Sequence, residues 1–352
     1  MIKLIGKQWG TISIFLITLF GFCIRFYSLT TRSMNIDEIT SADISNHTVS
    51  YIVQYALTKD SNPPLYYLFA HGSMMLMGGY SVFAVRFPAV IFGTLAIPTV
   101  YLIGKQIRNE TLGLFVAFLV SFIGPICWYS QEARAYSLVF FAFAGFTYFF
   151  VKMFKGDKSR TCIFGISFFA ALCLWSHFYS LLPIALCGII LLEREKIATL
   201  LSLLCTFLML SPMLLFFNFD QIRGRTIGHF GDPFWPSWYW LIQWWPNELF
   251  GLSWILVIPL IGYSLYRYRD PLLQYFALVG GVTILELVPL SLITNISQRY
   301  ALLVSPMLLS VALYPVSEWV DNQTSAGRKI AFFTVVIMIF FIINVGSTSP
   351  WV

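Results

Sequence analysis

Two adjacent carboxylates, Asp37 and Glu38, follow the first long apolar run of the chain, within the polar stretch MNIDEITSADISNHT. Charged side chains are costly near hydrocarbon, and those found there usually serve chemistry, ion handling or a water-filled cavity. A carboxylate can take the proton of an attacking hydroxyl. Adjacent side chains point apart on a strand or a helix, so we expect Asp37 and Glu38 to do different jobs.

Four further segments combine polar or charged side chains with aromatic rings. They are KDSNPPLYY (with Asp60, Asn62 and Tyr67), YSQEARAYSL (Glu132, Arg134 and Tyr136), ISQRY (Arg299 and Tyr300) and the Trp-rich DQIRGRTIGHFGDPFWPSWYWLIQWWPNE (Arg223, Arg225 and His229). Aromatic rings lie naturally at a membrane interface and can stack on sugar faces, and arginine holds phosphate with a planar fork. Together these segments predict a site for a polar substrate attached to a lipid.

The composition is that of a membrane protein. Of 352 residues, 58% are hydrophobic and 11% charged, and the mean hydropathy is +0.76, whereas a soluble domain is about 25% charged. The net charge of +6 comes from Lys and Arg scattered in short loops, as orientation signals are, which argues against nucleic-acid binding. We therefore expect an all-α polytopic membrane protein forming a single integral membrane domain over residues 1–352.

Eleven apolar runs predict membrane spans, each of which needs about 20 residues, although Thr161–His177 and Phe178–Leu192 are shorter and nearly continuous. The runs are Trp9–Leu29, Ala84–Ile103, Leu112–Tyr129, Tyr136–Met153, Thr161–His177, Phe178–Leu192, Ile197–Phe217, Leu249–Tyr266, Leu272–Ile293, Tyr300–Trp319 and Ile330–Val345. The first follows Lys3 and Lys7 and lacks a small-residue cleavage site, which indicates an uncleaved anchor with a cytoplasmic N-terminus.

The run Pro64–Gly79 decides the topology, because every later loop changes sides if it spans. With Pro64–Gly79 outside, five positive clusters fall in cytoplasmic loops, as the positive-inside rule requires. They are Lys105 with Arg108; Lys152, Lys155, Lys158 and Arg160; Arg194 with Lys196; Arg267 with Arg269; and Arg328 with Lys329. The sequence thus predicts a plasma-membrane protein with surface helices in a long first outer loop, residues 30–80, a second, Trp-rich outer loop, residues 218–248, and the active site on the outer face.

Six segments, in this order, resemble the GT-C glycosyltransferases. They are the Asp37-Glu38 pair, DSNPPLYY, the span RFPAVIFGTLAIPTVYLIGK from Arg86, YSQEARAYSL, SHFYS around His177, and SQRYALLVSP around Arg299. The resemblance points to the family 39 and 83 group, which includes dolichyl-phosphate-mannose protein mannosyltransferases and lipid A aminoarabinose transferases. One departure is Asn62, where the family often has His before the double proline.

The resemblance implies a GT-C architecture and an inverting transfer of a monosaccharide from a polyprenyl-phosphate carrier to a lipid, glycan or protein acceptor. It implies that Asp37 is the catalytic base and Glu38 its companion. A phosphate leaving group needs cations rather than an acid, so one carboxylate with arginines suffices. The expected substrate-binding residues are Asp60, Asn62, Arg86, Glu132, Arg134, Tyr136, His177, Arg223, Arg299 and Tyr300.

Structural interpretations compete at several of these positions. Glu132 and Arg134 could form an ion pair at the start of a span, Arg86 and Arg299 could be snorkelling anchors, and Asp60 could be a turn residue. Glu286, inside GVTILELVPL, fits either a cavity or a neutral core group. No metal ligand set is predicted, because no HxxxH or similar spacing accompanies His177 or His229, and a divalent metal is left open.

Two other functional classes compete with glycosyl transfer. A transporter or flippase of lipid-linked sugars would usually show internal repeats and polar sites at the membrane midplane, whereas this chain has no evident repeat and its ionisable residues are peripheral. A membrane acyltransferase would require a His-centred site, for which the isolated His177 is a poor candidate.

Overall fold

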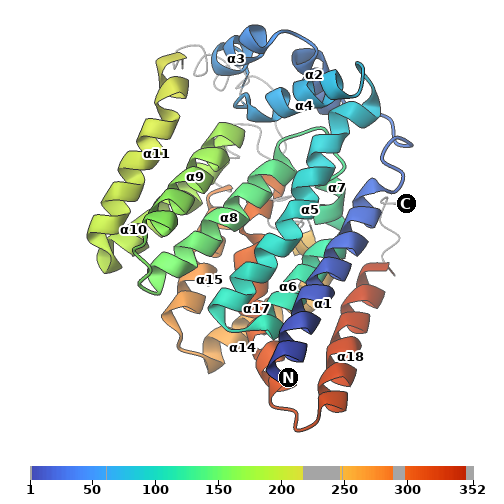
Figure 1. Ribbon diagram of the computed structural model, residues 1–352, viewed down its shortest axis with the longest axis vertical. Helices are drawn as coiled ribbons and strands as arrows, with labels where there is room; N and C mark the ends of the chain where they lie inside the picture. Colours follow the sequence, from blue (N-terminus) through green and yellow to red (C-terminus); the bar gives the residue numbers. More distant parts are fainter. Residues whose placement is uncertain (1, 61, 217–245, 248, 288–297, 346–352) are drawn as a thin grey trace, which may run out of the picture.

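The structure, a computed structural model, describes residues 2–60, 62–216, 246–247, 249–287 and 298–345. The described residues are mainly helical and contain no strand. Long helices run side by side between two ends of the molecule, and three short helices lie across one of these ends (Figure 1). This arrangement confirms the expected all-α fold with surface helices between the first and second long helices.

The long helices follow the apolar runs of the sequence. They are α1 (Ile2–Phe26), α5 (Val82–Ile107), α6 (Glu110–Phe122), α8 (Tyr136–Phe154), α9 (Arg160–Ser176), α10 (Leu181–Arg194), α11 (Lys196–Phe216), α14 (Trp254–Arg267), α15 (Pro271–Leu285), α17 (Ser305–Asp321) and α18 (Ala326–Val345). Short elements join or extend some of them: α7 (Gly124–Tyr129), and the 3₁₀ turns η1 (Phe178–Ser180), η2 (Gly251–Ser253) and η3 (Gln298–Val304).

Each of the eleven predicted spans is therefore occupied by a helix. Among the described residues, five helices are long and apolar enough to cross a membrane: Val82–Ile107, Tyr136–Phe154, Lys196–Met213, Arg299–Asp321 and Gly327–Asn344. Others are shorter, and the helix within Leu272–Ile293 ends at Leu285, so Glu286 lies at a helix end rather than well inside a span. Residues 288–293 of that run lie outside the described residues.

The three short helices form what we call the surface layer: α2 (Ile36–Ser45), α3 (Val49–Thr58) and α4 (Leu65–Leu76). Their polar N-caps explain where two of them start, because Asn35 accepts the N–H of Glu38 and Thr48 accepts that of Tyr51. At 12 residues, α4 is about 18 Å long, too short for a bilayer core of about 30 Å. Pro64–Gly79 thus lies on the end of the bundle, as the charge pattern predicts.

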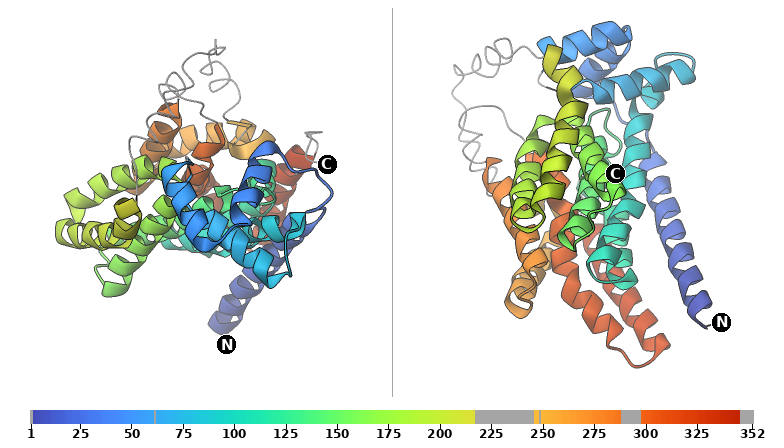
Figure 2. Two further views of the ribbon diagram at one scale, coloured as in Figure 1. Left: turned by 90° about the horizontal axis from the view of Figure 1, so that it is seen from above. Right: turned by 60° about the vertical axis from the view of Figure 1, so that its left-hand side comes forward.

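A second hydrophobic core joins the surface layer to the bundle. Buried side chains of α4, among them Tyr66, Tyr67 and Ala70, pack with α2, α3, the start of α5 and the segment before α8. In Figure 2 the layer lies over the bundle in the view from above and at that end of the long helices in the side view. The layer is consequently held in a definite position over the bundle rather than tethered by loops alone.

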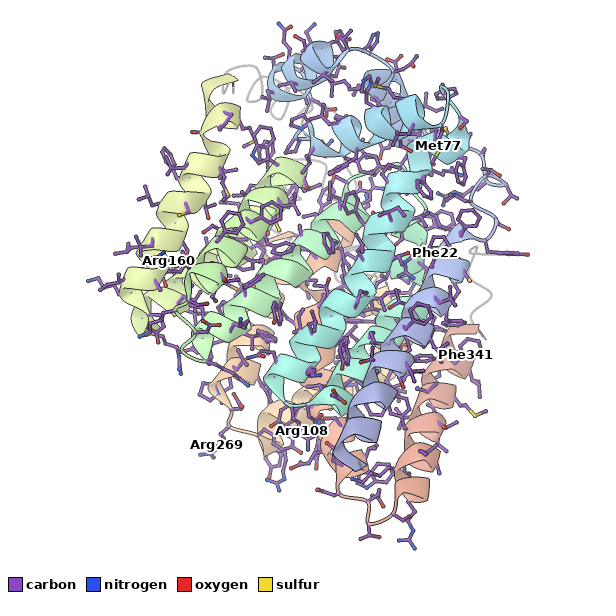
Figure 3. The ribbon with its side chains drawn as sticks, viewed as in Figure 1. Phe22, Met77, Arg108, Arg160, Arg269 and Phe341 are labelled. Carbon is purple, nitrogen blue, oxygen red and sulfur yellow. The ribbon has the colours of Figure 1, made fainter. Side chains whose placement is uncertain are left out.

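Positive charges gather at the end opposite the surface layer. Figure 3 labels Arg108 and Arg269 in the half of the molecule that lies away from Met77. The helices α11 and α18 lie at the periphery, with exposed side chains such as Leu204, Phe207, Ile339 and Phe341, as lipid-facing helices should. This distribution agrees with the predicted order of loops.

One predicted span, Leu112–Tyr129, is broken, and the break has a clear cause. The helix α6 ends at Phe122 because Pro125, in the next turn, has no N–H for the carbonyl of Ser121. The buried Arg25 of α1 replaces the missing donors: its guanidinium donates to the carbonyls of Ser121 at 2.9 Å and Val120 at 2.8 Å. Arg25 therefore caps α6 and attaches α1 to it.

We expect Arg25→Met to destabilise the protein by about 1–3 kcal/mol, because the carbonyl of Val120 loses its donor while that of Ser121 keeps only the Cys127 thiol at 3.3 Å. Thermal unfolding of the purified protein in detergent would measure the loss. Pro125→Ala restores an N–H within reach of Ser121, so the double variant should recover part of the stability. Equal unfolding temperatures for wild type and Arg25→Met would show that the carbonyls do not depend on Arg25.

Candidate active site

The site is organised by a buried ion pair between the surface layer and the bundle. Glu38, in the first turn of α2, and Arg86, in the first turns of α5, are 0% and 1% exposed. Arg86 Nε donates to Glu38 Oε1 at 2.7 Å and Nη2 donates to Oε2 at 2.8 Å, a two-pronged contact. The remaining donors of Arg86 bind the carbonyls of Leu29, Arg32 and Ser33 at 2.7–3.2 Å.

Glu38 connects a third segment to this pair. Its carboxylate also accepts the backbone N–H of Ala133 at 2.9 Å and that of Asn35 at 3.2 Å. Burial by itself would raise the pKa of Glu38, but the hydrogen bonds from Arg86, Ala133 and Asn35 outweigh it and leave the pKa below its ordinary value. With both oxygens occupied, Glu38 and Arg86 are placed to position other residues rather than to contact a substrate.

Asp37 faces a different direction from Glu38, as expected for neighbours on a helix. Its Oδ2 lies 3.1 Å from Nη2 of Arg299, which belongs to η3, and the two side chains are 38% and 23% exposed. The Arg299 guanidinium also lies 5.0 Å from the centre of the Tyr136 ring, a cation–π distance. Asp37 is therefore an accessible carboxylate held beside a cation.

Glu132 lies in the turn between α7 and α8, buried beneath α2. Its Oε1 accepts Nδ2 of Asn35 at 2.5 Å, and its Oε2 has no hydrogen-bond partner among the described residues. Burial raises the pKa of Glu132; Asn35 and Arg299 oppose the rise and the nearby Glu38 adds to it. No ion pair joins Glu132 to Arg134 in the described residues, because the two side chains point to different partners.

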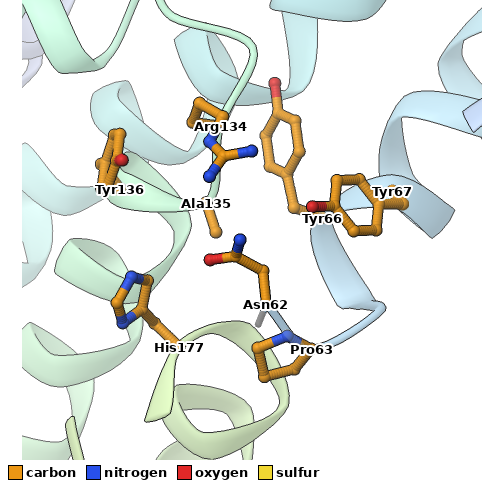
Figure 4. A pocket seen from close by; sticks show the side chains of 8 residues that line it. All are labelled: Asn62, Pro63, Tyr66, Tyr67, Arg134, Ala135, Tyr136 and His177. Carbon is orange, nitrogen blue, oxygen red and sulfur yellow. The ribbon is translucent and has the colours of Figure 1, made fainter. Parts of the chain in front are cut away.

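Two adjoining pocket lobes lie under the surface layer. The first, drawn in Figure 4, is lined by Asn62, Pro63, Tyr66, Tyr67, Arg134, Ala135, Tyr136 and His177. The second is lined by Tyr136, Val139, His177, Arg299, Tyr300, Leu302 and Leu303. Because Tyr136 and His177 line both lobes, the lobes share one wall, with Arg134 on one side of it and Arg299 on the other.

Asp60 supports this wall from behind. It accepts the Tyr67 hydroxyl at 2.8 Å and the backbone and side-chain nitrogens of Asn62 at 3.1 and 3.2 Å. Asp60 is thus a turn residue, as the competing interpretation held, and it also fixes two lining side chains. Arg134, the cation of the first lobe, donates to Ser41 Oγ at 3.3 Å, which connects the pocket to α2.

The structure thus brings together most of the predicted site residues. Asp37, Asn62, Arg134, Tyr136, His177, Arg299 and Tyr300 surround the two lobes or contact a residue that does, whereas Glu38, Arg86, Asp60 and Glu132 support them. Arg223 and the loop 218–248, apart from residues 246–247, lie outside the described residues. Among the described residues, no group of three or more His, Cys, Asp or Glu side chains is placed to hold a metal ion.

Three contributors were not singled out from the sequence. Arg25 and Arg32 are cations at and just after the end of α1; Arg32 lies 3.6 Å from the centre of the Trp128 ring and 3.7 Å from Glu38. Asn35 both caps α2 and binds Glu132. Asn35 could have been found, because N-x-x-E before an apolar residue is a capping-box pattern, whereas neither arginine occupies a pattern that reveals its partner.

We expect Glu38→Gln and Arg86→Met each to destabilise the protein by about 3–5 kcal/mol, because each leaves a buried charge without its partner. Arg86→Met also loses the three carbonyl contacts, so it should be the more harmful variant. Asp37→Asn, on the exposed side of the same turn, is the matched control and should leave thermal unfolding unchanged.

The pH dependence of unfolding provides a second measurement. Since the folded-state pKa of Glu38 is below its unfolded value, its contribution to stability is present above the unfolded pKa and is lost as pH falls through the folded pKa. Glu38→Gln should therefore flatten the acid limb of the stability profile, while an unchanged limb would show that other groups produce it.

Comparisons with known proteins agree with this architecture. A search of curated protein sequences finds no match. The model of the dolichyl-phosphate-mannose-protein mannosyltransferase family matches residues 61–216. That segment contains the first pocket lobe and the Glu132–Arg134 turn.

Among solved structures, ArnT from Cupriavidus metallidurans bound to undecaprenyl phosphate is 14% identical, with a TM-score of 0.63, over 92% of this chain and 63% of that one. The oligosaccharyltransferase of Archaeoglobus fulgidus in the apo form is 12% identical, with a TM-score of 0.61, over 96% of this chain and 55% of that one. AglB from the same organism, in complex with an inhibitory peptide and a dolichol-phosphate, is 14% identical, with a TM-score of 0.55, over 97% of this chain and 55% of that one.

This chain therefore spans about three fifths of the length of the solved structures it matches. At these identities the likeness is one of fold, and it extends over nearly the whole chain. Together with the family match, it confirms the resemblance indicated by the sequence motifs: the chain has the fold of the GT-C membrane glycosyltransferases.

Proposed function

We propose that this protein is a membrane glycosyltransferase that moves a monosaccharide from a polyprenyl-phosphate carrier to an acceptor, with inversion at the anomeric carbon. The main support is the accessible carboxylate of Asp37 paired with Arg299 at the edge of a pocket that also contains Arg134. A carboxylate base next to two guanidinium groups that can bind phosphate suits this chemistry. The carriers bound by two of the similar structures, undecaprenyl phosphate and dolichol-phosphate, are of the same chemical class.

In the proposed reaction the acceptor oxygen or nitrogen attacks the anomeric carbon while the bond from that carbon to the phosphate oxygen breaks. The acceptor proton goes to Asp37, and the bonding electron pair leaves with the polyprenyl phosphate. Charge grows on the departing phosphate, where guanidinium groups in a site of low dielectric stabilise it. Arg299 and Arg134 supply such groups from two sides of the Tyr136–His177 wall.

The contact between Asp37 and Arg299 has a consequence for the order of events. In the structure Arg299 occupies one oxygen of the proposed base. A phosphate that recruits Arg299 would draw it away from Asp37 and leave the carboxylate open to the acceptor. The donor would thus prepare the base by binding before the acceptor.

The side of the membrane is part of the proposal. The surface layer and the pocket lie at the end opposite the loops rich in Lys and Arg, and such loops usually remain cytoplasmic. We therefore place the N-terminus in the cytoplasm and the transfer reaction at the outer face of the cell membrane, where Asp37 would meet the acceptor.

The decisive experiment uses the purified protein in bilayers with radiolabelled polyprenyl-phosphate sugars. We expect Asp37→Asn to bind the donor like wild type but to lose at least about 100-fold in turnover, the scale of a missing general base. The amide keeps the shape of the side chain and cannot accept the proton. Glu38→Gln, assayed at a temperature where it stays folded, should lose less.

Retention of more than a few per cent of wild-type turnover by Asp37→Asn would exclude Asp37 as the base. Absence of sugar transfer from every polyprenyl-phosphate donor, with a folded wild-type protein, would contradict the proposed function itself.

Cysteine labelling tests the proposed orientation. Leu76, at the end of α4, is 90% exposed, and Lys158, in the loop before α9, is exposed at the opposite end. In a background with the exposed Cys23 replaced by Ala, an impermeant maleimide should label Leu76→Cys in intact cells and Lys158→Cys only after permeabilisation. The reverse pattern would place the site on the cytoplasmic face.

A further inference from the structure

His177 lies at the centre of the site, and its surroundings determine its protonation. It ends α9 and caps η1: its backbone N–H donates to the carbonyl of Cys173, and its Nδ1 accepts the backbone N–H of Tyr179 at 3.4 Å. A backbone N–H can only donate, so Nδ1 carries no proton. In a neutral imidazole the proton is then on Nε2.

The charge of the neighbours keeps this imidazole neutral. His177 is buried, and the pocket lobes that it lines contain the guanidinium groups of Arg134 and Arg299. A third positive charge there would be repelled by both arginines and would lose its hydration. The rings of Tyr300 and Tyr179, at centroid distances of 4.8 and 5.3 Å, cover the imidazole further.

Nε2 therefore faces the pocket as an uncharged donor. Figure 4 shows one ring nitrogen of His177 on the side of Tyr136 and Arg134 and the other toward the neighbouring helix. Nε2 makes no hydrogen bond to the described residues, and the buried hydroxyl of Tyr136, on the same wall, has no partner among them either. The shared wall thus has one uncharged O–H group, from Tyr136, and one uncharged N–H group, from His177, between the two guanidiniums.

This set of groups fits one kind of ligand. The carboxylates nearby are engaged elsewhere or lie outside the lining, so the side chains at the shared wall are mainly hydrogen-bond donors. A sugar hydroxyl needs an acceptor as well as a donor, whereas phosphate oxygens only accept. A phosphate seated between Arg134 and Arg299 would meet Nε2–H and the Tyr136 hydroxyl together.

We propose that His177 is a neutral hydrogen-bond donor, held in one tautomer by its cap on η1, that binds the phosphate of the lipid-linked donor through Nε2–H. The proposal rests on the proposed function and adds a role to it: His177 recognises the phosphate without titrating, and is neither the acid nor a metal ligand. Its affinity contribution should consequently be independent of pH over the physiological range.

Two substitutions separate the roles of the two ring nitrogens. His177→Asn keeps an acceptor near Nδ1 and loses the donor at Nε2, while His177→Gln places an amide N–H near Nε2. Binding is measured by titrating the protein in nanodiscs with undecaprenyl phosphate, without acceptor. We expect His177→Asn to weaken binding about tenfold, the effect of one hydrogen bond to a charged group, and His177→Gln to restore most of the loss. His47→Asn, in the exposed part of the surface layer, should bind like wild type.

The pH dependence distinguishes a neutral donor from a cation. The ratio of wild-type to His177→Asn affinity should stay constant from pH 5.5 to 8, because the titration of the phosphate itself affects both proteins equally. A ratio that rises as pH falls toward 5.5 would mean that His177 binds as imidazolium and would overturn the proposal. So would wild-type affinity in His177→Asn.

Further arms cover folding and the source of the phosphate. If His177→Asn does not fold, Tyr136→Phe, which removes only the neighbouring hydroxyl, takes its place. This variant should bind undecaprenyl phosphate more weakly, and wild-type affinity would overturn the shared-wall site.

Inorganic phosphate should compete poorly with undecaprenyl phosphate. If it binds with equal affinity, and His177→Asn weakens both ligands equally, the site belongs to free phosphate instead. If the protein transfers sugar but both His177→Asn and Tyr136→Phe bind the carrier like wild type, this inference is overturned while the proposed function stands.

Discussion

The ion pair between Glu38 and Arg86 holds the site together. It connects the first turn of α2 to the first turns of α5, and the free donors of Arg86 fix the chain from Leu29 to Ser33. A charge pair in a dry interior recovers its desolvation cost only when its geometry is good and its remaining hydrogen bonds are satisfied. Here the carboxylate has four donors, and Arg86 binds three carbonyls, so the condition is met.

This arrangement explains why two neighbouring carboxylates differ. Glu38 has a structural role: it attaches α2 to the turn at Ala133 and so fixes the direction of the helix. Asp37, one residue earlier, then points to the pocket edge, where Arg299 meets it. A rigid support beneath a reactive side chain is what preorganised catalysis requires, because a small displacement of a base is costly to turnover.

A second buried arginine solves a different problem in the same region. Pro125 interrupts the helix that would otherwise continue from α6, and the interruption allows the chain to turn through α7 toward Glu132 and Arg134. Arg25 satisfies the carbonyls that the break leaves unpaired. In a membrane, unpaired backbone groups are particularly costly, so the turn that presents part of the site depends on a side chain from α1.

The amino-acid sequence by itself determined the fold class, the positions of the long helices and the surface position of α4, because these follow from apolar length and from the distribution of Lys and Arg. Local patterns would also have located the start of α2, through Asn35 and Glu38. The residues of the site could be listed from motifs for the same reason: carboxylates, arginines and aromatic rings are conspicuous in an apolar chain.

Only the tertiary structure decided which of these residues meet. Asp37 and Arg299 are 262 positions apart and Glu38 and Arg86 are 48 apart, and no local pattern relates such partners. Burial, too, could be decided only by the tertiary structure. Arg86, expected to bind substrate or to act as an anchor, is buried and supports the site instead. Oε2 of Glu132 is buried without a partner among the described residues. Packing between distant helices sets burial and partner choice, and packing is not encoded at any single position.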